Sequence, residues 1–466
     1  MLKRFIPALI LVLAFAGCTM APKYERPAAN ISASWPEGGA YKASSAEGKA
    51  ADISWKDYFR SESLTKLIEL ALENNKDLKI AALNIEKAAA AYRIQQSALF
   101  PDVTAGASAT RQGVPDNISA TGKSYTSSVY RANVNASYEL DFFGKIRSLN
   151  QKALETYLAT DEAHKSAKIS LIAEVTNAYC AYLADRRLLE LAQNTYSAQK
   201  QTYDVIKKKF DLGSGSELDV TQAEVQVETA KASFIQYTRL TAQAKNAIVL
   251  LAGAPVDGLL DGETIDSLSF MTDLPEGVPS QVLTSRPDII AAEHSLMAAN
   301  ADIGAARAAL FPSISLTGSF GLASDSLDTL FTSGAAYAWN FTPSLSIPIF
   351  NRGRIKANLE VAKVSEKIAA EQYEKALQTA FREVADQLAA RGTYKDELST
   401  QETLVNTSRK AFDLASLRYD NGITSYLNVL DAQRSLFAAE QKAVGVKQQY
   451  LTNLVTLYKV LGGGQI

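Results

Sequence analysis

Histidine and cysteine, which often act in catalysis or bind metal ions, are scarce in this 466-residue chain. It has 2 histidines and 2 cysteines, without a His-Glu-x-x-His or a paired Cys-x-x-Cys motif. His164 and His294 fall on predicted helices about 130 residues apart, and no nucleophile–base spacing or phosphate-binding loop accompanies them. We therefore expect no enzyme activity, no cofactor and no metal site, and we interpret both histidines as surface or packing residues.

The charge of the chain is nearly balanced, since Lys and Arg number 48 and Asp and Glu number 50. This composition predicts no basic face, so we expect no nucleic acid as a partner. Ala, Gln, Leu, Lys and Glu are abundant, which favours long helices.

The N-terminus predicts a secretory signal over residues 1–17. Lys3 and Arg4 form a short basic region, and an apolar run of about 12 residues follows, from Phe5 to Ala16. As a helix this run would reach roughly 18 Å, whereas the hydrocarbon core of a membrane is about 30 Å thick. The run is therefore too short to be a membrane span.

Cys18 is the residue for which we expect covalent chemistry. The sequence Phe15-Ala16-Gly17-Cys18 resembles the bacterial lipobox, with Phe15 where Leu is usual. The resemblance implies that Cys18 becomes a lipid-bearing N-terminus, and Thr19 in place of an inner-membrane retention Asp favours the outer membrane. The alternative is ordinary cleavage nearby, with Cys18 discarded. Cys180 lies on a largely apolar helical stretch and is expected to be an inert core residue.

Two stretches about 209 positions apart align without a gap, from Lys209 to Glu224 and from Arg418 to Gln433. In each, a long helical pattern runs into a glycine, Gly213 or Gly422, and a second helical pattern begins about four residues later. Glycine just past a helix is the usual left-handed stop. Each stretch therefore predicts a tight turn between two long helices.

The rest of the chain repeats in the same way, because Leu72–Pro101 aligns on Leu283–Pro312 at an offset of about 211. Each half is predicted to contain a helix, a β-hairpin, a very long helix, a turn and a helix. The N-terminal segment is rich in Pro, Ala, Ser and Gly and predicts an extended strap. The expected division is a strap over 18–60, a first repeat over 61–252, a linker over 253–280 and a second repeat over 281–466.

After each Leu-Phe-Pro the hydrophobic period changes to two, which predicts β-hairpins over 102–142 and 313–350. Runs of about ten residues with one apolar face are typical of transmembrane β-strands, although a half-buried sheet in a soluble domain is the alternative. Four strands cannot close a barrel, and an open edge in lipid is prohibitive. The membrane interpretation therefore requires several copies of the chain, without fixing their number.

Long helices are predicted over 143–212, 217–251, 354–420 and 424–460. The first has no internal Gly or Pro for nearly 70 residues after Gly144, which corresponds to about 100 Å. Ile172, Val175 and Tyr179 follow a 3–4 spacing, as in a coiled coil.

Together these motifs resemble a known family. The chain resembles the TolC-like outer-membrane factor superfamily in five features. These are the lipobox, Pro22-x-Tyr-x-x-Pro27, the paired Leu-Phe-Pro motifs, Asp141-Phe-Phe-Gly-Lys145 and the two glycine turns. The chain is similar to its OprM-like (NodT-type) lipoprotein branch. The resemblance implies a mainly α homotrimer with a 12-strand β-barrel in the outer membrane and a 12-helix α-barrel tube across the periplasm. It implies a closed tip that opens when a periplasmic adaptor (membrane fusion) protein and an inner-membrane pump, of the RND type, dock.

The same resemblance places a periplasmic gate at the second turn. Leu427 and Asp431 would narrow the lumen, and on a helix they share a face as i and i+4. A Leu ring can block ions by dewetting, and a carboxylate ring disfavours anions. Asp219 resembles an acidic gate position, whereas Thr424 replaces the Arg of an ionic lock, so closure should depend on Leu427 packing and Tyr419 hydrogen bonding. The alternatives are coiled-coil core for Leu427, a solvated partner for Asp431 and a helix-start carboxylate for Asp219.

We further hypothesise that the adaptor contacts both turns, through Leu212, Gly213, Ser214, Gly422 and Ile423. The expected function is the outer-membrane channel of a tripartite multidrug efflux system. The alternatives are an outlet for secreted protein or metal ions and a structural coiled-coil surface protein. The last would explain the helices but not the paired hairpins.

Overall fold

The computed structural model describes residues 19–28, 30–42, 46, 48–332 and 336–464. The predicted signal peptide and Cys18 lie outside the described residues. The chain divides into two compact units. The first comprises the described residues up to Ala28 with 84–161 and 291–373, and the second comprises those from 30 to 83 with 162–290 and 374–464.

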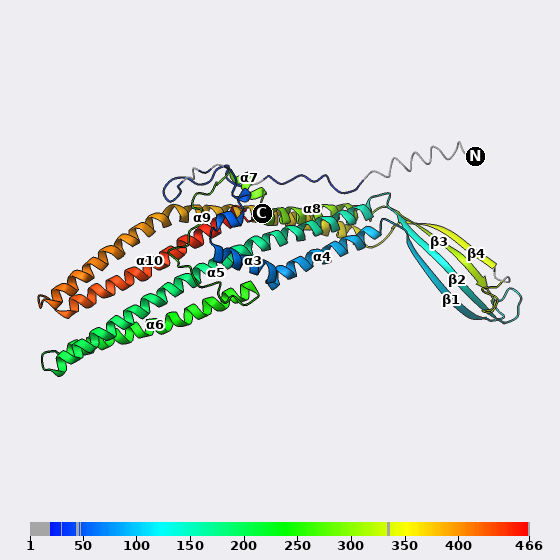
Figure 1. Ribbon diagram of the computed structural model, residues 1–466. Coiled ribbons are helices and arrows are strands. Elements are labelled where there is room, and N and C mark those ends of the chain that lie inside the picture. Colours follow the sequence, from blue (N-terminus) through cyan, green and yellow to red (C-terminus); the bar gives the residue numbers. More distant parts are fainter. Residues whose placement is uncertain (1–18, 29, 43–45, 47, 333–335, 465–466) are drawn as a thin grey trace. The chain divides into compact units, whose positions relative to one another are not determined.

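The first unit contains a single four-stranded sheet (Figure 1). Its strands lie in the order β1 (Asp102–Val114), β2 (Tyr125–Leu140), β3 (Ser313–Ser324) and β4 (Ala336–Ser346). All three neighbouring pairs are antiparallel. The two hairpins come from the two halves of the sequence, so the β2–β3 pairing joins the repeats.

The register of the sheet separates apolar from polar side chains, because directly paired residues project to the same face. One cross-strand row is apolar, and the next row is polar. The apolar row is Ala105, Val134, Phe320 and Trp339, and the polar row is Thr104, Asn135, Ser319 and Asn340. The apolar face is largely uncovered within one chain, since Phe320, Trp339 and Phe341 are 60%, 73% and 61% exposed.

Helices continue from the sheet in this unit. They are the C-terminal part of α4 (Lys76–Ser97), the N-terminal part of α5 (Lys145–Asp211), most of α8 (Pro287–Ala308) and the N-terminal part of α9 (Arg354–Asp420). Asp141 caps α5, because its carboxylate accepts hydrogen bonds from the backbone N–H groups of Ile146 (3.0 Å) and Arg147 (2.8 Å). The strap is tied to α8 where Arg26 and Tyr24 both donate to Glu293.

The second unit is built from helices around an aromatic core. It holds η2 (Ala50–Asp52), α2 (Trp55–Tyr58), α3 (Glu62–Asn74), α6 (Glu217–Ala252), α7 (Pro279–Thr284) and α10 (Tyr426–Val460), with the remaining parts of α4, α5, α8 and α9. Tyr58 stacks on Tyr458 with ring centroids 4.1 Å apart, and its hydroxyl donates to the Leu454 carbonyl at 2.8 Å. Phe270, from the expected linker, packs against the rings of Tyr58 and Phe59.

The long helices begin and end near the expected residues. The helix expected over 354–420 occupies Arg354–Asp420, and the one expected over 424–460 begins at Tyr426, because Ser425 has the extended backbone of an N-cap. Gly392 lies within α9 where the strap carbonyl of Ala40 would collide with a Cβ atom. None of the helices in the described ranges has a segment long and apolar enough to cross a membrane.

Candidate functional site

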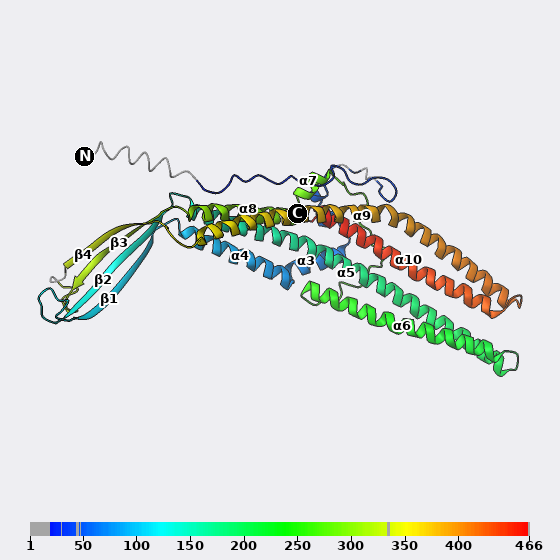
Figure 2. The same ribbon diagram turned by 180° about the vertical axis from the view of Figure 1, so that it is seen from behind.

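The two predicted turns lie at the same end of the second unit, one joining α5 to α6 and the other α9 to α10 (Figure 1, Figure 2). At the first, Gly213 has φ 77° and donates to the Phe210 carbonyl at 2.8 Å, while Ser214 N–H donates to the Lys209 carbonyl at 2.9 Å. At the second, Gly422 has φ 71° and the equivalent bonds are both 2.9 Å. Each turn is therefore a Schellman motif, which requires the left-handed glycine.

The helices that follow the two turns also begin at equivalent positions. Ser216 caps α6, accepting a hydrogen bond from Leu218 N–H at 3.2 Å. Ser425 occupies the same place before α10, but its side chain makes no capping bond. Instead the Asn428 amide donates to the Thr424 hydroxyl. Thr424, which stands where the resemblance places an Arg, thus holds the start of its own helix.

Leu427 and Asp431 lie on the exposed surface of α10, one helical turn apart. The Leu427 side chain is 48% exposed within one chain, so it is not part of this chain's own coiled-coil core. The Asp431 carboxylate is 3.8 Å from the Arg434 guanidinium, and both side chains are more than half exposed. Leu218 occupies the matching position of α6 and is also exposed, at 64%.

Tyr419 makes ring contacts at the end of α9. Its ring lies 5.4 Å from that of Tyr426, and the Lys209 ammonium lies 5.4 Å from its centroid. The role of Tyr419 hydrogen bonding in closure stays a prediction. Asp219, in the first turn of α6, is half-buried, and its charge contributes to the raised pKa of Tyr426.

The residues expected to contact an adaptor are all exposed. Leu212 and Ile423 are the largest of them, at 83% and 65% exposure, and they stand beside the two glycines. Each turn therefore presents one apolar side chain next to hydrogen-bonded backbone.

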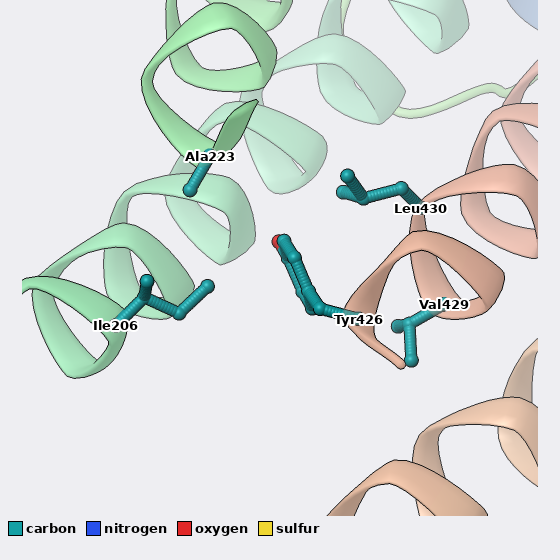
Figure 3. Close-up of a cluster of buried hydrophobic side chains, with 5 residues drawn as sticks. All are labelled: Ile206, Ala223, Tyr426, Val429 and Leu430. Atoms are coloured by element: carbon teal, nitrogen blue, oxygen red, sulfur yellow. The ribbon is translucent and has the colours of Figure 1, made fainter. Parts of the chain in front are cut away.

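Tyr426 is a residue that the sequence reasoning missed. It belongs to a buried cluster with Ile206, Ala223, Val429 and Leu430, which brings α5, α6 and α10 together (Figure 3). The sequence does distinguish this position, because Tyr426 directly precedes Leu427 and matches the acidic Glu217 of the first repeat.

The remaining candidates for chemistry are packing residues. His294 lies with Nδ1 2.6 Å from a carboxylate oxygen of the buried Glu155, a pairing that the sequence did not predict. Cys180 is buried, and burial raises the pKa of its thiol to about 12, which makes it inert at neutral pH. No group of three or more His, Cys, Asp or Glu side chains placed to hold a metal ion occurs in the described part of the chain.

Two repeats of helix, β-hairpin and long helix pair, with matching turns, define the class of outer-membrane channels. The sequence pattern of the outer membrane efflux protein family matches residues 67–254 and 278–463, and this chain belongs to that family. The family is one of channels and not of enzymes.

Relatives and solved structures agree over nearly the full length. The solvent efflux pump outer membrane protein SrpC of Pseudomonas putida is 46% identical, with 97% of each chain covered. The antibiotic efflux pump outer membrane protein ArpC of Pseudomonas putida is 43% identical, with 100% of this chain and 96% of that one covered. The open state of the Neisseria gonorrhoeae MtrE outer membrane channel is 39% identical, covers 96% of this chain and 99% of its own, and has a TM-score of 0.87. The chain is accordingly an efflux channel of the outer membrane.

Proposed function

We propose that the chain forms a homotrimer that is the passive, gated outlet of a tripartite multidrug efflux system. Its partners are a periplasmic adaptor protein and an inner-membrane pump of the RND type. The observation that carries the proposal is the family match across both repeats, together with relatives whose names describe solvent efflux and antibiotic efflux. Substrates of such different chemistry favour a wide conduit over a selective binding site.

The sheet supports the membrane part of the proposal. One of its faces is apolar across all four strands, and β1 and β4 are its edges within the described chain. Such a sheet is unstable as a single copy, because its apolar face is exposed in water and the N–H and C=O groups of its edges have no partners in lipid. Pairing β4 of one copy with β1 of the next removes the edges, and three copies supply about twelve strands, a width that leaves an open lumen.

The exposed position of Leu427 and Asp431 supports the gate. Three copies around one axis would bring three leucines and three carboxylates to a constriction, where a leucine ring excludes ions by dewetting. Because Arg434 lies 3.8 Å from Asp431, each carboxylate already has a local counter-charge. We therefore assign the closed state mainly to the apolar ring, and the exposed turns around Gly213 and Gly422 to the adaptor contact.

Planar-bilayer conductance of the purified protein tests the gate. The wild type should have a very small conductance that rises sharply in the Leu427→Ala/Asp431→Ala variant. The matched control is Leu218→Ala/Gln222→Ala, which changes the equivalent face of the first repeat and should conduct like the wild type. A large, ungated wild-type conductance would contradict the gate and favour a general porin.

We also propose that Cys18 carries a covalent lipid that anchors the chain in the outer membrane. The lipobox-like sequence before it supports this assignment. Cys18→Ser should abolish labelling by radioactive palmitate while the trimer still assembles. Labelling that persists in this variant would show that the assignment is wrong.

A further inference from the structure

The Tyr426 side chain is 4% exposed within a single chain, although it lies at the first residue of α10 and at the tip of a helix pair. Figure 3 shows its ring directed from α10 towards Ile206 of α5 and Ala223 of α6. The ring therefore crosses from the second helix pair to the first. It is the aromatic member among the fully buried residues of this cluster, and the partly buried rings of Tyr203, Phe412 and Tyr419 pack around it.

The first repeat has no aromatic residue at the position that matches Tyr426. The residue that matches Tyr426 is Glu217, which is exposed in the first turn of α6. The space for the ring is provided by Ala223, which is fully buried and has only a methyl side chain. The two repeats therefore play different parts in this contact. The second repeat contributes the ring of Tyr426, and the first contributes the space beside Ala223, which we call the slot.

The Tyr426 side chain also carries a hydroxyl group, which this packing buries. The Tyr426 hydroxyl is buried, and no residue in the described part of the chain forms a hydrogen bond with it. Burial, Tyr419 and Asp219 raise its pKa to about 12, so the phenol is neutral at physiological pH. A buried hydroxyl without a partner is costly, which makes this packing easier to undo than that of a phenylalanine.

Farther along α10, its contacts with α6 include polar bonds. Arg434 donates to the Gln226 side chain at 3.2 Å, and Gln441 donates to the Tyr237 hydroxyl at 3.0 Å. Bonds of this kind can be replaced by water as the helices separate, whereas the buried ring of Tyr426 has to leave an apolar slot.

We propose that Tyr426 is the positioning residue of the gate: its ring in the slot formed by Ile206 and Ala223 holds the start of α10 against the first helix pair. Leu427 follows it directly on the same rigid helix, so Leu427 cannot move away from the axis until the ring leaves the slot. Opening then exposes the hydroxyl, which gains hydrogen bonds to water. This inference rests on the proposed function, and it adds a residue that does not itself line the constriction.

Conductance in a planar bilayer tests the proposal with Tyr426→Ala, Tyr426→Phe and the matched control Glu217→Ala. Tyr426→Ala should raise the mean conductance by at least about tenfold, because the closed state loses the burial of a whole ring. Tyr426→Phe should conduct like the wild type or less, since it keeps the ring and removes the unpaired hydroxyl. Glu217→Ala should also match the wild type.

The outcomes separate this inference from the proposed gate. If Tyr426→Ala conducts like the wild type while Leu427→Ala/Asp431→Ala conducts more, the proposed role of Tyr426 is wrong and the proposed gate is supported. If neither variant differs from the wild type, both proposals are wrong, the gate at Leu427 and Asp431 and the role of Tyr426. If Tyr426→Phe is as leaky as Tyr426→Ala, the hydroxyl and not the ring holds the helix, which also overturns the proposal.

A second variant covers the case in which Tyr426→Ala does not assemble. Ala223→Leu leaves the tyrosine in place and fills its slot, so it should expel the ring and raise the conductance to a similar degree. Trimer assembly on a native gel shows that the protein is folded. A folded Ala223→Leu trimer with wild-type conductance would overturn the proposal.

Discussion

The strap contact at Glu293 gives a prediction that can be worked from its geometry. The Glu293 carboxylate accepts hydrogen bonds from Arg26 Nε at 2.6 Å, from Arg26 Nη2 at 2.8 Å and from the Tyr24 hydroxyl at 3.1 Å. Its side chain is 9% exposed, whereas that of Arg26 is 55% exposed. The substitution Glu293→Gln keeps the size of the side chain and removes the charge and one acceptor oxygen. We expect it to loosen the strap without unfolding α8.

The size of the effect follows from these contacts. A hydrogen bond to a charged group contributes about 1.5–3 kcal/mol, but solvent around Arg26 reduces its bidentate pair to about 1–2 kcal/mol. The Tyr24 bond adds roughly 1 kcal/mol. A complete loss of these contacts, about 2–3 kcal/mol, corresponds to a roughly 30- to 150-fold increase in the undocked fraction of the strap. This is the upper limit for Glu293→Gln, because the remaining amide oxygen can still accept the bonds that Tyr24 and Arg26 Nε share.

Hydrogen exchange of the strap amides, followed by mass spectrometry, measures that fraction. Exchange over residues 19–28 should accelerate in Glu293→Gln and not in Glu25→Gln, which removes the same charge from the exposed side of the strap. Equal protection in the wild type and Glu293→Gln would refute the reasoning. Burial, and then Glu293, raises the pKa of Tyr24. The contribution of Tyr24 is therefore fully present below about pH 10, its unfolded pKa, and is lost as the pH rises through the higher folded value.

Three further substitutions test the helices and the sheet. Asp141→Ala removes the cap of α5 and should lower the free energy of unfolding by about 1–2 kcal/mol in thermal melts, with an unchanged melt contradicting the cap. Arg286→Ala removes a buried guanidinium from Glu383 and Asp288, whose side chains are 39% and 41% exposed, and should cost about 1–3 kcal/mol in guanidinium titration, whereas an unchanged midpoint would show that these ion pairs are not stabilising. Gly321→Val places a side chain against the Ala132 carbonyl of β2 and should abolish trimer assembly on native gels, and normal assembly would show that β2 and β3 do not pair this way.

The elements of the fold could be read from the sequence because they depend on local patterns. The period of two in the hairpins and the long helical pattern of α9 depend on neighbouring residues only, and the observed limits of α9 are Arg354–Asp420. The two turns were predictable for the same reason, since each needs a left-handed glycine between two helical patterns. The start of α10 differs by two residues, because Thr424 and Ser425 belong to the turn and its cap.

The contacts between distant segments could not be read in this way. Tyr426 has the pattern of an ordinary helix-start residue, and only the approach of α5 and α6 shows that its ring is buried. The pairing of His294 with Glu155 joins positions 139 residues apart, and periodicity gives no information about such partners. The sequence placed Leu427 and Asp431 on one face of a helix, but the role of that face depends on copies of the chain that surround it.

The shared geometry of the two glycine turns has a consequence for stoichiometry. The backbone hydrogen bonds of the turns are equivalent, while the apolar residues beside the glycines differ, Leu212 in one and Ile423 in the other. A partner that recognises the backbone of such a turn therefore has two sites on each chain, at equal intrinsic affinity. A partner that contacts the side chains of Leu212 and Ile423 binds one turn with higher affinity than the other. Counting bound partner molecules per chain, by mass or by titration, distinguishes these two modes of recognition.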